Sequence, residues 1–241
     1  MKLFTQITPS LTRSASDVSL SAGKSDPYME AVTSGDMETA QKMVDEKANA
    51  NGYTIGPVYH GTDAEFYIFD KSSDLGYHFG SEQQAMYKRG RRVISAYLSM
   101  TDPLRLDDHV WDNPRTLAVG LSQFDSGKEL ENAAARWEAL KHDETELDQD
   151  LPWNEFKKKH RELLDLIRSA RLEAMRIGKN LLQNAKNDGV IYKNEVEGGG
   201  DSYIAFKSNQ IKSADPVTYD KDKKPIPLNK RFDSSNPDIR Y

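Results

Sequence analysis

The sequence contains no cysteine among its 241 residues. This absence excludes disulfide bonds, thiolate metal sites and a cysteine nucleophile. No apolar run approaches the roughly 20 residues that a helix needs to cross a bilayer, and the N-terminus lacks the continuous apolar stretch of a secretory signal. The net charge of −5 disfavours nucleic acid or an anionic membrane as a partner of the molecule as a whole. We therefore expect a soluble intracellular protein without a metal site.

The composition changes along the chain and predicts four parts. Residues 1–25 are rich in serine and threonine and predict a flexible leader. Residues 26–55 predict a small helical segment, in which Asp36 is suited to cap the second helix. Residues 56–214 carry the main domain, and residues 215–241 form a C-terminal extension, either a linker or a segment lying on the surface.

Within the main domain, short segments rich in aromatic and β-branched residues predict strands. They are GPVYHGT, EFYIFD, GYHFG and VISAYLSM, after which TDPLRLDD leaves the sheet through a proline turn. A charged helical insertion follows over about residues 117–187, with its longest helix from Trp153 to Ala185. Strands return at residues 189–192 and 202–206. This order predicts an α+β fold with a split, mostly antiparallel β-sheet.

The run of basic residues at 157–161 lies in this insertion. On a helix, such a run is usually a solvated face. We therefore expect a solvated surface there rather than a contact with nucleic acid.

The first motif that can carry chemistry is Tyr59-His60-Gly61-Thr62, at the end of a predicted strand. The histidine ring offers a donor and an acceptor, and the threonine adds a hydroxyl. Glycine lets a ligand approach the backbone. Taken alone, such a motif more often marks a turn than a site.

The second motif is Gly76-Tyr77-His78-Phe79-Gly80, an aromatic cluster between two glycines. Such rings can hold a flat ligand ring, or they can simply pack in a buried strand. Side chains alternate along a strand, so we expect Tyr77 and Phe79 on one face and His78 on the other.

The third feature covers residues 187–214. An acidic, glycine-rich loop runs into an alternating strand, and Gln210 then opens the segment Gln-Ile-Lys-Ser. In this order the three features resemble the ADP-ribosyltransferase superfamily, and in particular the domain of phage polyvalent proteins. The resemblance covers about residues 56–241, since the closing FDSSNPDIRY also looks like the end of the phage type.

The resemblance implies roles for the first two motifs. His60 hydrogen-bonds a ribose hydroxyl of NAD, the Gly61 backbone pairs with the nicotinamide carboxamide, and Thr62 helps on the adenosine side. The strand after Gly76 supplies the aromatic ring that stacks on nicotinamide. The family position falls on His78, with Tyr77 as the neighbouring candidate; the complete cofactor-binding set is Tyr59, His60, Gly61, Thr62, Gly76, Tyr77, His78 and Phe79.

The sequence departs from the family at the catalytic acid. Many transferases place a glutamate directly before the Tyr-Ile pair of the last strand, and Ser202 stands there in this chain. A neutral hydroxyl cannot supply the negative charge that stabilises a developing oxocarbenium ion. Asp201, Glu197 and Gln210 are the nearby substitutes, and the candidate catalytic group is His60, Glu197, Ser202 and Gln210. A shifted acid, weak substrate-assisted transfer and an NAD binder without chemistry all remain open.

We expect an NAD-dependent enzyme that transfers ADP-ribose to a macromolecule, a protein rather than a nucleic acid. The resemblance implies a phage or prophage gene, and a location in the bacterial cytoplasm or the virion. One alternative is a degenerate NAD-binding or structural module. A second is the RNA 2′-phosphotransferase branch, which the paired histidines suggest.

Overall fold

The computed structural model describes residues 26–70, 72, 74–87, 92–108, 110, 113–145, 147, 150–195 and 197–241. The expected leader, residues 1–25, lies outside the described residues.

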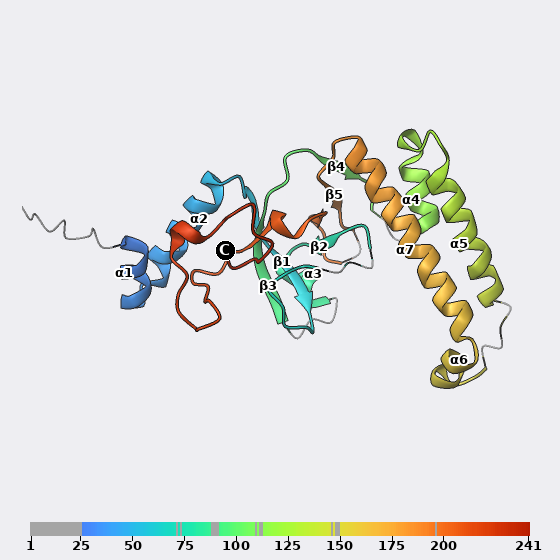
Figure 1. Cartoon of the computed structure of the whole chain (residues 1–241), viewed down its shortest axis with the longest axis horizontal. Helices are drawn as coiled ribbons and strands as arrows, with labels where there is room; N and C mark the ends of the chain where they lie inside the picture. The colour runs from blue at the N-terminus through green and yellow to red at the C-terminus, as the bar shows by residue number, and fades with distance from the viewer. Residues whose placement is uncertain are drawn as a thin grey trace, which may run out of the picture.

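Two small sheets form the centre of the molecule (Figure 1). The first has the order β1-β3-β7, and the second has the order β2-β6-β5-β4. All strand pairs are antiparallel except β4 with β5. The predicted α+β class with a split, mostly antiparallel sheet is therefore confirmed. The strands are β1 (Ile55–Thr62), β2 (Tyr77–Phe79), β3 (Arg92–Leu98), β4 (Pro103–Leu106), β5 (Gly189–Lys193), β6 (Asp201–Ala205) and β7 (Ile211–Ser213).

Apolar side chains that alternate along the strands build separate core layers. On β5, Ile191 belongs to the cluster shared by the two sheets, whereas Val190 and Tyr192 face the helices of the insertion. On β3, Leu98 joins the layer between the sheets, and Tyr97 joins the layer under the N-terminal helices. Each sheet thus carries helices or loops on its outer side, which follows from the period of two in its sequence.

The N-terminal helices α1 (Pro27–Ser34) and α2 (Met37–Ala50) cover the outer side of the first sheet. The Asp36 carboxylate accepts a bond from the Thr39 backbone, so it caps α2 as its sequence predicts. The C-terminal segment packs into the same layer through Phe232, which is 3% exposed. Residues 215–241 therefore lie on the surface of the domain, which is one of the two arrangements expected for them, and do not form a free linker.

The insertion forms an arm of helices on the outer side of the second sheet, seen at the right of Figure 1. Where one helix was expected from Trp153 to Ala185, two are present, and they meet at His160. None of the helices in the described ranges is long and apolar enough to cross a membrane. The arm contains α4 (Pro114–Gly120), α5 (Glu129–Thr145), α6 (Trp153–Lys159) and α7 (Arg161–Asn184), with the 3-10 turn η1 (Ser122–Phe124) after α4. Outside the arm, α3 (Glu82–Tyr87) lies near the first sheet, and two further 3-10 turns are η2 (Ser208–Gln210) and η3 (Leu228–Lys230).

Two local expectations were wrong. The segment EFYIFD forms no regular strand, and only Ile68 makes an isolated bridge, to Asp238. Phe66 and Phe69 both turn inward against His60, a spacing that a strand does not give. The segment after β3 leaves the first sheet as expected, but no strand was expected within it, and Pro103–Leu106 forms β4 of the second sheet, parallel to β5.

Candidate functional site

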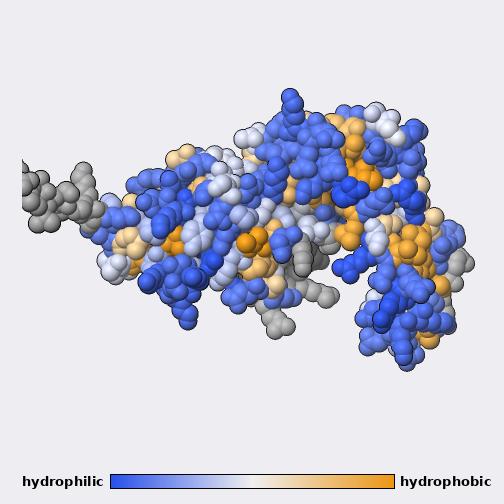
Figure 2. Space-filling model, viewed as in Figure 1, coloured by the Kyte–Doolittle hydropathy of each residue, from blue (hydrophilic) through white to orange (hydrophobic). Residues whose placement is uncertain are grey.

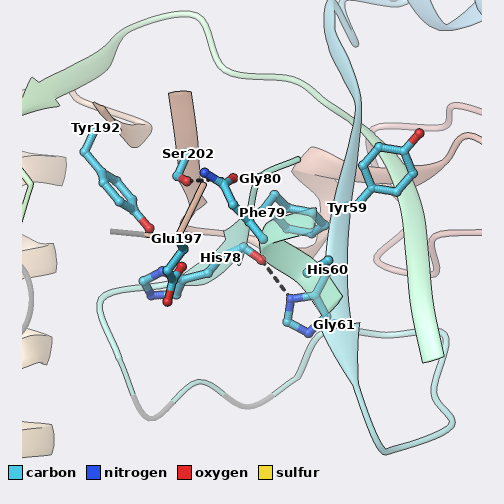
Figure 3. Close-up of a pocket in the computed structure, with 11 residues that line it drawn as sticks. Tyr59, His60, Gly61, His78, Phe79, Gly80, Tyr192, Glu197 and Ser202 are labelled. Atoms are coloured by element: carbon cyan, nitrogen blue, oxygen red, sulfur yellow. Dashed lines mark hydrogen bonds between the residues drawn. The ribbon is translucent and has the colours of Figure 1, made fainter. Parts of the chain in front are cut away.

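A pocket lies where β1, β2, α3 and the loop between β5 and β6 meet (Figure 3). Tyr192, Glu197 and His78 stand on one side, and Tyr59 and His60 on the other. Eleven residues line it: Tyr59, His60, Gly61, His78, Phe79, Gly80, Gln84, Ala85, Tyr192, Glu197 and Ser202. The pocket thus draws together residues from all three sequence motifs.

His60 sits on β1 in a cage of phenylalanine rings. Its Nδ1 atom lies 2.8 Å from the carbonyl oxygen of His78. A carbonyl can only accept, so Nδ1 carries the hydrogen and donates it. Burial lowers the pKa of His60 below its usual value, although the bond to His78 opposes this shift. The ring is therefore neutral at pH 7, and its Nε2 atom is an acceptor.

His78 faces away from its two neighbours on β2. The rings of Tyr77 and Phe79 both contact Phe69 in the layer between the sheets. His78 pairs across the sheet with Ile204 on the arm side, and its Nε2 lies 3.7 Å from the Asp74 carboxylate. The expected alternation along this strand is therefore present.

Asp74 also connects the pocket to the arm. Its carboxylate accepts a bond of 3.2 Å from Arg171 on α7. Asp74 and Arg171 are partly buried, with side chains 21% and 29% exposed. A charged contact from the arm thus lies directly behind a histidine that lines the pocket.

Two buried amides contact Ser202, and one of them, Asn194, also contacts the carboxylate of Glu197. Asn194 Nδ2 lies 3.0 Å from Glu197 Oε2 and 3.4 Å from Ser202 Oγ. The Ser202 hydroxyl donates to Gln84 Oε1 over 3.1 Å, and Gln84 Nε2 donates to the Gly199 carbonyl over 3.0 Å. Asn194, Ser202 and Gln84 are each less than 5% exposed. Ser202, which stands at the family position of the acid, and Glu197 therefore contact the same side-chain amide, that of Asn194.

The loop that carries Glu197 is held at several points. Asn194 accepts the Glu197 amide through its side chain and donates its own amide to the Gly200 carbonyl. Gly198, Gly199 and Gly200 all have positive φ angles, a region that L side chains rarely adopt. The three glycines thus form a tight turn. Glu197 stands directly before this turn and lines the pocket (Figure 3).

The glycines of the motifs serve packing. A Cβ atom on Gly61 would lie 2.0 Å from the Ala85 carbonyl oxygen, so glycine allows α3 to approach β1. On Gly80 it would lie 1.9 Å from Gln84 Oε1, and on Gly76 2.3 Å from the Ala205 carbonyl oxygen. We expected glycines that leave room for a ligand; at these three positions the room is filled by the chain itself.

Four of the expected site residues lie outside the pocket lining: Thr62, Gly76, Tyr77 and Gln210. Gln210 Oε1 accepts from the amides of Phe206 and Lys207, and its Nε2 donates to the carbonyls of Ser99 and Asp188. Its side chain is thus fully used in holding the end of β6 against the start of β5. Asp201 faces outward and pairs with Arg105.

Sequence reasoning missed Gln84, Asn194 and Tyr192. Gln84 follows the second motif by four residues and carries a capping signal: its Oε1 accepts from the Ser81 amide, and Ser81 Oγ from the Gln84 amide. Asn194 stands between β5 and the glycine turn, in a segment already singled out. Their buried contacts join distant segments, which a single sequence does not show. Within the described ranges, no group of three metal-binding side chains occurs.

The comparisons with known proteins agree with this arrangement. A family model described as ADP-ribosyltransferase in polyvalent proteins matches residues 49–219. No curated protein and no solved structure shows a significant match. The matched range contains β1 to β7, the arm and every residue that lines the pocket. The chain belongs to the family of ADP-ribosyltransferase domains of polyvalent proteins.

Proposed function

We propose that this chain is an NAD-dependent ADP-ribosyltransferase in which Glu197 supplies the catalytic carboxylate. The observation that carries the proposal is the shared amide of Asn194, which contacts both Ser202 and Glu197. In many of the transferases that the motifs resemble, a glutamate stands at the place of Ser202. A carboxylate from the neighbouring loop therefore reaches the same corner of the pocket.

His60 is proposed to bind the sugar of NAD. Its Nδ1 is engaged by the His78 carbonyl, so the neutral ring presents Nε2 as an acceptor for a ribose hydroxyl. The place of His60 beside Phe79 supports this role, because both line one wall of the pocket. His78 takes the stacking position against nicotinamide.

The proposed reaction breaks the bond between C1′ of the ribose and the nicotinamide nitrogen. Nicotinamide leaves with the bonding electron pair, and positive charge develops on the ribose. A nucleophilic atom of the acceptor then bonds to C1′ and gives up its proton to Glu197 or to water. A fixed carboxylate stabilises the charge that develops, and bound groups hold the reactants in line.

The decisive experiment measures nicotinamide release from NAD by purified variants. We expect Glu197→Gln to keep NAD affinity and to lower the rate by about two orders of magnitude or more. Glu195→Gln is the matched control, because it removes an exposed carboxylate from the same loop. The control should keep the full rate.

A second variant tests the geometry of the proposal. Adding Ser202→Glu to Glu197→Gln returns a carboxylate to the family position, and we expect part of the rate to return. Circular dichroism checks that the double variant folds. If Glu197→Gln retains the full rate, the shifted acid is wrong. If the wild type binds NAD but releases no nicotinamide, and Ser202→Glu gains no activity, the chain is a binding module.

The acceptor is proposed to be a protein, in the setting of a phage or prophage gene. Incubation with labelled NAD and a host lysate, followed by protease and nuclease digestion, separates protein from nucleic acid acceptors. The RNA 2′-phosphotransferase alternative is less favoured. That chemistry needs cations for a phosphate, and none of the eleven residues that line the pocket is lysine or arginine.

A further inference from the structure

The free end of the arm carries an open groove between α6 and the first turns of α7, remote from the pocket. Four cationic side chains line it: Lys157, Lys158, Arg161 and Arg168. Asp165 is the single acid among the lining residues. Figure 2 shows mostly hydrophilic surface at this end. The groove is therefore strongly basic in a chain whose net charge is −5.

These four cations differ from other cations of the arm. Arg115, Lys128 and Arg136 each lie within 4 Å of a glutamate oxygen. In the described part of the chain, no carboxylate lies that close to the four groove cations, which are all exposed. Their charge is thus left for something outside the chain.

An exposed indole stands beside the cations. Trp153 is 62% exposed and lies nearly parallel to the ring of buried Phe156, at 19° and a centroid distance of 5.6 Å. Lys157 Nζ lies 5.5 Å from the centre of the indole ring. An exposed aromatic ring that packs on Phe156 and lies beside a cation in a basic groove offers a surface on which a nucleobase can stack.

The sequence alone predicted a solvated face for the basic run at 157–161, but the groove and the exposed indole favour a ligand. We infer that this basic groove binds single-stranded nucleic acid, with its phosphates on the four cations and a base on Trp153. A protein partner fits less well. Interfaces between proteins are depleted in lysine, and their centres are apolar. Here two of the four cations are lysines, and the apolar lining is limited to Trp153 and Leu164.

The helix that carries part of the groove also contacts the region behind the pocket. Arg161 begins α7, and Arg171 of the same helix contacts Asp74 behind His78. Ten residues of helix separate them, a rise of about 15 Å. The groove and the contact behind His78 therefore lie on one helix, about three turns apart. The inference concerns docking, and it does not depend on which macromolecule receives ADP-ribose.

The test is fluorescence anisotropy of labelled single-stranded oligo(dT) titrated with the full chain. We expect binding that weakens as salt rises, because cations release counterions from the strand. Replacing Lys158, Arg161 and Arg168 together by glutamine should lower affinity at least tenfold and flatten the salt dependence. Trp153→Ala should weaken binding about fivefold or more, and Trp153→Phe should retain most of it.

The matched control is Lys42→Gln, Lys221→Gln and Lys230→Gln combined, which removes the same charge from exposed positions outside the arm. It should leave binding unchanged. The inference is overturned if the wild type does not bind oligo(dT), or if the control weakens binding as much as the groove variant. It is also overturned if polyglutamate displaces oligo(dT) and if Trp153→Ala weakens the binding of polyglutamate as much as that of oligo(dT). The groove would then bind acidic protein segments.

Discussion

Two regions of this molecule bury polar side chains, and they use them in different ways. Beside the C-terminal segment, Arg231 donates to Tyr28, to the carbonyls of Ser213 and Asp215, and to a third carbonyl. Lys212, 1% exposed, donates to the carbonyls of Asn236 and Asp238. The partners of both cations belong to the chain itself. This region therefore fixes the C-terminal segment to the first sheet.

The pocket buries its amides just as deeply but leaves functional atoms at a cavity. Gln84 and Asn194 are 4% and 3% exposed, and both hold the loop that presents Glu197. His60 is fixed through Nδ1, which leaves Nε2 as an acceptor. The difference teaches that burial alone does not mark a site. A polar side chain is a candidate for chemistry where its fixed partners leave an atom facing a cavity.

The largest expected effect is on stability, in the region around Arg231 that fixes the C-terminal segment to the first sheet. Arg231→Met removes the donors to two buried groups, the Ser213 carbonyl and the Tyr28 hydroxyl, and to two partly buried carbonyls. Unsatisfied buried groups cost about 1–3 kcal/mol each, so the two buried groups lead us to expect the free energy of unfolding to fall by about 2 kcal/mol or more. Urea denaturation measures this change. NAD affinity of the folded fraction should stay unchanged; a loss of less than 1 kcal/mol, within the range of an ordinary surface change, would contradict the role given to Arg231.

The next effect belongs to the pocket. Gly80→Ala places a Cβ on the site of Gln84 Oε1 and forces the amide away from Ser202 and Gly199. We expect nicotinamide release to fall about tenfold, since a small misplacement of catalytic groups has large effects on rate. Hydrogen exchange of the loop amides at 194–200 should speed up. Gly127→Ala is the control, because its added Cβ meets only ordinary contact.

A smaller effect separates the regions by pH. Burial lowers the pKa of Lys212 to about 8 from its usual 10.5. Between these values the unfolded chain binds more protons than the folded one, so stability gains with rising pH. Compared with Lys212→Met, the wild type should gain about 1 kcal/mol or more in unfolding free energy from pH 8 to pH 9.5. Denaturant curves at several pH values check this. A constant difference between the two proteins would show that Lys212 does not titrate in this range.

The sequence motifs predicted most of the residues that line the pocket. Alternation on β2 placed His78 apart from Tyr77 and Phe79, and the departure at Ser202 directed attention to Glu197. Gln210 was grouped with them because its segment carries the family resemblance. In space, its amide instead joins the backbones of β5 and β6. Adjacency in sequence does not show that Glu197 lines the pocket and that Gln210 does not, because this depends on the direction in which each side chain points.

The missing parts of the site have one physical cause. Gln84 and Asn194 act through hydrogen bonds that join a helix, a loop and a strand, and Gln84 lies 118 positions from Ser202. No local pattern specifies such contacts. The fold class was predictable for the opposite reason, because periodicity of apolar residues is local. The break between α6 and α7 at His160 and the formation of β4 beside β5 in the second sheet depend again on tertiary packing.

The smallest expected effect concerns the arm. Arg136 and Glu173 join α5 to α7 through an exposed pair of 3.1 Å, and replacing both by glutamine should change unfolding free energy by no more than about 0.5 kcal/mol. NAD affinity should stay the same, because neither residue lies near the pocket lining.

Arg171→Gln on the same helix provides the contrast. It removes a partly buried partner of Asp74, which lies behind His78, so we expect NAD affinity to weaken by a factor of about two to five, the scale of one modest hydrogen bond. Calorimetry with NAD measures both variants. Equal affinities for the two would show that the arm only covers the second sheet, whereas weaker binding in the Arg136 and Glu173 variant would make the whole arm part of the NAD site.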